Sequence, residues 1–121
     1  MIGSTRQVSV LAFATPVDMR KSFDSLAALV TENLKQDVLS GEVFLFVGKD
    51  RKRAKVLYWD GTGLCVFAKR LEKGRFAAPW LRDEKGPLAM TMSELALFIE
   101  GSELVGRVPL SPTPFRFENV G

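Results

Sequence analysis

The sequence contains no histidine and only one cysteine, Cys65, among its 121 residues. Without histidine the chain lacks the commonest general base, the commonest metal ligand and the usual activator of a cysteine nucleophile. Since one cysteine cannot form an intrachain disulfide and Cys65 lies in an apolar run, we expect a buried, unreactive thiol. A zinc site would have to consist almost wholly of carboxylates, so we predict neither a metal nor another cofactor.

Long hydrophobic runs are also missing, and none approaches the roughly 18 residues that a membrane-spanning helix needs. The apolar stretch from Val8 to Ala14 is short and interrupted by Ser9, which favours an edge strand over an export signal. We therefore predict no membrane partner and a cytoplasmic location, at the nucleoid if the protein binds DNA.

Sequence motifs for catalysis are absent as well, because the chain has neither a phosphate-binding loop of the GxxxxGK[ST] type nor a GxSxG nucleophile elbow. Asp18, Asp24, Asp60 and Glu42 could in principle hold two metal ions in a nuclease site. Asp18 is instead expected to cap a helix, Asp60 to make a turn and Asp24 to face solvent. We predict that the protein is not an enzyme.

Periodic apolar residues define two helices. Between residues 19 and 36 they recur every three or four positions, which predicts a long amphipathic helix that Asp18 caps. Thr91 and Glu94 have the spacing of a capping box and open a short helix, SELALFIE, that ends at Gly101.

Short apolar runs bounded by turn residues predict the strands. They are Val8–Ala14, Val43–Val47, Ala54–Trp59, Leu64–Ala68 and Leu88–Met90, with a further start at Arg75-Phe76. Val43–Val47 is apolar at every position, which is typical of a strand covered on both faces. We predict an α+β fold, an antiparallel meander of four to five strands with both helices packed on it. Residues 1–102 would form one domain, and the Pro-rich residues 103–121 an irregular tail.

Positive charge is concentrated in the centre of the sequence. From Lys49 to Arg75 the chain has nine Lys or Arg and three acids, a net of +6, whereas the whole chain is +3. Such a cluster suits phosphate contacts, and solvated loops that keep the sheet soluble are the alternative. The predicted DNA-backbone contacts are Lys49, Arg51, Lys52, Arg53, Lys69, Arg70, Lys73 and Arg75, with Arg20 and Lys21 beside them.

Aromatic residues interleave with this basic cluster. Tyr58, Trp59 and Trp80 are candidates for stacking on unpaired bases or for contact with a protein partner. Phe67 and Phe76 lie in the same stretch, and aromatic residues in strands more often belong to the core.

Three blocks of the sequence resemble a known family. They are DMRKxFDxLAALV from Asp18, VLYWDGxGLC from Val56 and KRLExGRF from Lys69. The chain is similar over about residues 6–102 to the TnpB-type, or Orf2-like, accessory proteins of the sixty-six family of bacterial insertion sequences. These are distinct from the RNA-guided nucleases also called TnpB. The family usually has glycine at the positions of Ser22 and Ser25.

The resemblance implies a protein encoded in a mobile element beside a separate transposase and required with it for efficient transposition. Combined with the basic cluster, it predicts a non-enzymatic accessory protein that binds DNA or the transposase–DNA complex through a basic hairpin. The alternative is a protein-interaction module that docks the transposase or self-associates without touching DNA.

Overall fold

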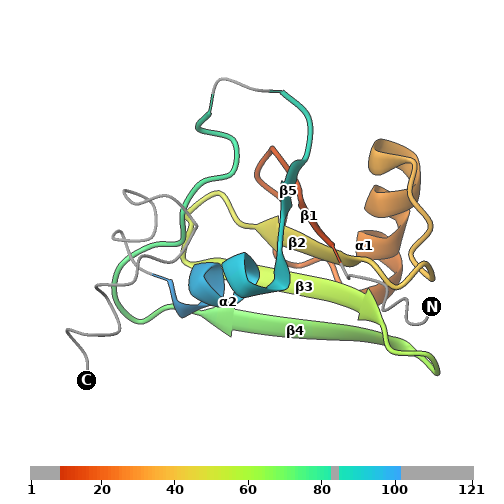
Figure 1. The fold of residues 1–121 in the computed structure, drawn as a ribbon. Coiled ribbons are helices and arrows are strands. Elements are labelled where there is room, and N and C mark those ends of the chain that lie inside the picture. The colour runs from red at the N-terminus through yellow and green to blue at the C-terminus, as the bar shows by residue number, and fades with distance from the viewer. Residues whose placement is uncertain (1–8, 83–84, 102–121) are drawn as a thin grey trace.

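The computed structural model describes residues 9–82 and 85–101, which form a five-stranded sheet and two helices (Figure 1). The elements in chain order are β1 (Val10–Ala12), α1 (Phe23–Leu29), the π-helical turn η1 (Val30–Leu34), β2 (Val43–Val47), β3 (Arg53–Trp59), β4 (Leu64–Arg70), β5 (Leu88–Met90) and α2 (Met92–Glu100). The predicted α+β class is confirmed. The predicted tail, residues 103–121, lies outside the described residues, and the single domain stays a prediction.

The sheet is mixed, so the prediction of a purely antiparallel meander is wrong. Its strand order is β4-β3-β2-β1-β5, and β1 runs parallel to β2, with Val10 paired to Val43. Only β2, β3 and β4 form an antiparallel meander. Parallel neighbours need a long crossover, and the stretch containing α1 and η1 provides it between β1 and β2.

Alternate residues of β2 pack against different helices. Val43, Leu45 and Val47 belong to a core that includes Leu95 and Phe98 of α2. The intervening Phe44 and Phe46 belong to a second core with Leu26 of α1 and Val30 of η1. All five residues of β2 are buried, which confirms the prediction that this strand is covered on both faces.

The first helix is much shorter than predicted. It begins at Phe23 with Ser22 as its N-cap, not near residue 19 with Asp18 as the cap. The Asp18 carboxylate instead accepts hydrogen bonds from the backbone N–H and the guanidinium of Arg20. After Leu29 the helix widens into the π turn, and Lys35 ends it in the left-handed conformation (φ 56°).

The polar turns after β3 and before α2 form as the sequence predicts. Oδ1 of Asp60 accepts hydrogen bonds from the N–H groups of Thr62 and Gly63, while Gly61 adopts φ 104°. Thr91 Oγ1 accepts from the Glu94 N–H at 3.1 Å, and Glu94 accepts from the Thr91 N–H at 2.8 Å. Arg75-Phe76, by contrast, does not begin a strand.

Removing the cap of α2 should destabilise the fold. Thr91→Ala loses the hydrogen bond to the Glu94 N–H and should lower the free energy of unfolding by about 1 kcal/mol in urea denaturation. Ser93→Ala is the control, because Ser93 lies within the first turn and does not cap it. An equal loss in both variants would contradict the capping role.

Candidate nucleic-acid interface

Backbone hydrogen bonds bring the two basic segments of the central region together at one end of the sheet. The Leu71 N–H donates to the Lys52 carbonyl at 2.8 Å, and the Phe76 N–H donates to the Arg51 carbonyl at 2.7 Å. The β2–β3 loop (48–52) and the segment after β4 (71–76) are therefore neighbours.

A third basic segment, residues 17–21, joins the same end. The Val17 N–H donates to the Val47 carbonyl at 2.9 Å, and Lys55 Nζ donates to the Lys21 carbonyl at 2.7 Å. The segment and the β2–β3 loop approach so closely that a Cβ on Gly48 would lie 2.7 Å from Met19 Cγ. We call segments 17–21, 48–53 and 69–76 together the basic end.

The basic end contains all ten of the predicted phosphate-contacting residues, against the three acids Asp18, Asp50 and Glu72. Its most unusual feature is the pairing of Arg53 with Arg70 directly across β3 and β4. Facing residues share one face of the sheet, and like charges so placed repel each other. An anion between the two guanidinium groups would reduce this repulsion.

Each of these arginines has one exposed acidic neighbour. Arg53 lies 3.5 Å from Asp50, and Arg70 lies 3.6 Å from Glu72, with all four side chains largely exposed. Exposed ion pairs of this length are weak, so both guanidinium groups remain able to exchange partners.

Some residues of the predicted set have structural roles instead. Arg51, at φ 61°, donates from Nε to the Phe76 carbonyl at 2.9 Å. Lys69 is half-buried, and its Nζ donates to the Ile99 carbonyl at 2.9 Å in the last turn of α2, where the helix dipole is negative. The sequence offers no signal that separates these two from their exposed neighbours.

Four other cations of the basic end are exposed and make no ion pair or side-chain hydrogen bond with described residues. They are Lys49, Lys52, Lys73 and Arg75. Charged side chains without a protein partner can meet phosphates without first breaking another contact. These four residues are the strongest candidates for DNA-backbone contact.

Two of the three acids of the basic end, Asp18 and Asp50, accept hydrogen bonds that favour their ionised form. Hydrogen bonds from the Arg20 side chain and backbone keep the pKa of Asp18 far below its usual range, and Arg20 has a correspondingly raised pKa. The Lys52 N–H, bonded to the Asp50 carboxylate at 2.9 Å, is the main cause of a lowered pKa at Asp50. Both acids are therefore ionised near neutral pH and reduce the local positive charge.

The candidate stacking residues are not gathered at the basic end. Tyr58 and Trp59 lie at the opposite end of β3, about 17 Å and about 20 Å from Arg53 at the usual rise of a strand. Phe76 is fully buried and stacks on Phe98, with ring centroids 5.4 Å apart. Only Phe67, which is 45% exposed on β4, presents a large open aromatic surface among these residues.

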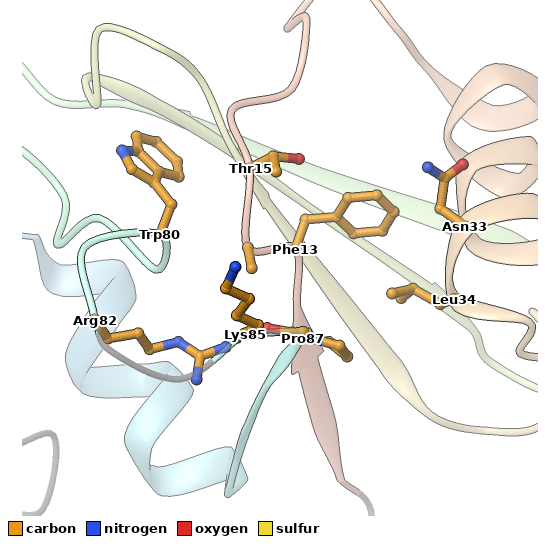
Figure 2. Close-up of a pocket in the computed structure, with 10 residues that line it drawn as sticks. Phe13, Thr15, Asn33, Leu34, Trp80, Arg82, Lys85 and Pro87 are labelled. Carbon is orange, nitrogen blue, oxygen red and sulfur yellow. Dashed lines mark hydrogen bonds between the residues drawn. The ribbon is translucent and has the colours of Figure 1, made fainter.

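Trp80 lines a separate pocket of about 450 Å³ beyond the end of β1 (Figure 2). In Figure 2, Trp80 and Arg82 lie to the left of Phe13, and Leu34 lies to its right. Arg82 Nε donates to the Pro79 carbonyl at 2.9 Å, which fixes the loop that carries Trp80. No pattern in the sequence indicates this pocket.

The acids considered for a nuclease site do not come together. Within residues 9–82 and 85–101, no three His, Cys, Asp or Glu side chains are grouped as metal ligands. Asp60 lies in the β3–β4 turn, at the far end of β3 from the segment that contains Asp18.

Cys65 is half-buried rather than buried, and partial desolvation raises the pKa of its thiol.

The described residues thus form a small α+β fold with a basic sheet end, and neither helix in them has the length and apolar composition to cross a membrane. The model of the IS66 Orf2-like protein family matches residues 8–107, and the chain belongs to this family of insertion-sequence accessory proteins, as the resemblance implied. The family connects it with transposition.

Two relatives from Sinorhizobium fredii extend this similarity. The uncharacterized proteins y4jC and y4hO are 37% and 39% identical to the chain over 101 residues, which cover 84% of it and 85% and 86% of their own lengths. No solved structure matches the chain.

The position of Lys69 predicts a structural rather than a binding role. Lys69→Met keeps the aliphatic stem and removes the ammonium group at the end of α2, so it should lower the free energy of unfolding by about 1 kcal/mol. Lys73→Met is the matched control and should change stability by less than about 0.5 kcal/mol. Equal effects in urea denaturation would contradict the assignment.

Asp60 should make stability depend on pH in the acid range. Hydrogen bonds from the Thr62 and Gly63 N–H groups lower its pKa from 3.8 to about 2. The ionised carboxylate therefore stabilises the fold fully above about pH 4, and this contribution disappears as the pH falls towards 2. The difference in unfolding free energy between wild type and Asp60→Asn should shrink over that window.

Urea denaturation at several pH values between 2 and 6 measures that difference. Asp24→Asn is the comparison, because the exposed Asp24 accepts no hydrogen bond from the described residues. A difference between wild type and Asp60→Asn that does not vary with pH would rule out the turn as its source.

Proposed function

We propose that the protein is a non-enzymatic accessory protein of insertion-sequence transposition that binds DNA, alone or with the transposase, through its basic end. The observation that carries the proposal is the convergence of three basic segments at one end of the sheet. Lys49, Lys52, Lys73 and Arg75 are exposed there and have no partner among residues 9–82 and 85–101, and they lie beside the repelling pair Arg53 and Arg70.

The chemistry of these groups specifies the kind of binding. Lysine and arginine side chains neutralise phosphates and release condensed counterions, which gives affinity that falls steeply with salt. Contacts to phosphates position a protein on DNA but read no sequence. The basic end should therefore bind element-end DNA and unrelated DNA of equal length with similar affinity.

Removing the unpartnered cations should weaken this binding in proportion to their number. With four to six phosphate contacts, the log–log dependence of affinity on salt should have a slope of about −4 to −5. Each of Lys52→Ala, Lys73→Ala and Arg75→Ala should reduce the magnitude of that slope by about one, and the triple variant by about three. Gel-shift titrations at two or more salt concentrations measure these changes.

Lys35→Ala is the control, since it removes one exposed positive charge outside the basic end. It should leave both affinity and slope close to those of the wild type. The proposal fails if the protein does not bind DNA at low salt, or if the triple variant behaves like Lys35→Ala.

A second candidate function is docking of the element's transposase without DNA contact. It is supported by an apolar groove of about 400 Å³ between α2 and the sheet, lined by Tyr58, Phe67 and Met92 among others. Phe67 and Met92 are 45% and 46% exposed. Co-purification of the two folded proteins after nuclease treatment supports this function, and failure to co-purify counts against it.

A further inference from the structure

The long edge of the sheet is open. β4 pairs with β3 on one side, and no described element lies on its other side (Figure 1). Its first five residues, Leu64–Ala68, carry no charge, whereas Lys69 and Arg70 follow at the basic end. An uncharged edge strand is a template for pairing with another strand.

The hydrogen bonds that flank β4 show which of its backbone groups face outward. The Asp60 N–H bonds to the Gly63 carbonyl and the Leu71 N–H to the Lys52 carbonyl, in line with the β3–β4 register. Because bonded and non-bonded pairs alternate in antiparallel strands, residues 65, 67 and 69 bond to β3. The N–H and C=O groups of residues 64, 66, 68 and 70 therefore point to the open edge.

The side chain at the centre of this edge is also uncovered. Phe67 is 45% exposed on the face that carries α2, and it borders the apolar groove lined by Tyr58, Met92 and Ile99. A second strand beside β4 would cover both the ring and the mouth of this groove. The open backbone groups and the open apolar surface thus lie at one place.

We propose that two copies of the chain pair through β4 in antiparallel orientation, with a two-fold axis beside Phe67, and join two five-stranded sheets into one. Residue 66 of one copy then bonds to residue 68 of the other, and residue 64 bonds to residue 70. All outward backbone groups of β4 are satisfied, and the two Phe67 rings face each other in a non-hydrogen-bonded pair.

The charges fit this register. Lys69 faces Cys65 of the other copy and Arg70 faces Leu64, so no two cations oppose each other in β4. A second copy is thus complementary to this edge in hydrogen bonding and apolar surface, and it brings no like charges face to face along β4.

Cysteine scanning reads the register directly. In the Cys65→Ser background, cysteines at position 67 would have Cα atoms about 4.5 Å apart, within the range for a disulfide. Phe67→Cys should therefore form a disulfide-linked dimer at least tenfold faster than Val66→Cys or Ala68→Cys under mild oxidation. Thr62→Cys, an exposed position in the same hairpin, is the control for random collision.

A proline tests the backbone bonds. Ala68→Pro removes an outward N–H, and an edge strand accepts proline where the N–H faces solvent. The full-length wild type should sediment as a dimer at micromolar concentration, and Ala68→Pro should raise the dissociation constant at least tenfold. Ala68→Ser keeps the N–H and should dimerise like the wild type.

Several results would overturn the proposal. They are a monomeric wild type at tens of micromolar, cross-linking fastest at position 66 or 68, and an unchanged dimer in a folded Ala68→Pro. Dimerisation only after truncation at Gly101 would also overturn it and would assign the edge to residues 102–121. If Ala68→Pro does not fold, the cysteine scan decides. These experiments contain no DNA, so their outcome is separate from that of the DNA-binding proposal.

Discussion

The register between β3 and β4 is the constraint on which the arrangement of the basic end depends. It pairs Arg53 with Arg70 and continues beyond the strands, where Lys52 bonds to Leu71. A shift of β4 by one residue would turn Leu64 and Val66 away from the α1 core, so the apolar pattern fixes the register. Arg53 and Arg70 therefore face each other because the register that buries the apolar residues places them there.

Much of this fold follows from the sequence because local patterns specify it. Val43–Val47 is apolar throughout and is buried on both faces, and the Asp60 turn and the Thr91 cap have short-range side-chain signals. The proximity of segments 48–53 and 69–76 also follows from the sequence, since a hairpin brings the start of one strand beside the end of the next.

The remaining features depend on contacts between distant residues, which local patterns do not encode. Val17 bonds to the end of β2, and Arg20 engages Asp18, so the chain turns where helical spacing alone predicted the first turn of a helix. Likewise, no local pattern distinguishes Lys69 from the neighbouring basic residues, because its hydrogen bond to the Ile99 carbonyl depends on the packing of α2. Sequence composition locates the charge, and tertiary packing decides which cations bond to the protein and which stay exposed.

Both kinds of cation, bonded and exposed, occur in β4. Its last two residues are cations, one bonded to α2 and one opposing Arg53, whereas Leu64–Ala68 presents an uncharged edge. Edge strands that must stay unpaired are commonly protected by charged side chains, and in β4 the charge lies only at one end. The lysine and arginine therefore limit which registers a second strand can adopt but leave the central backbone groups open. The proposed anionic partner and the proposed second strand would contact different atoms of β4, so the two proposals are compatible.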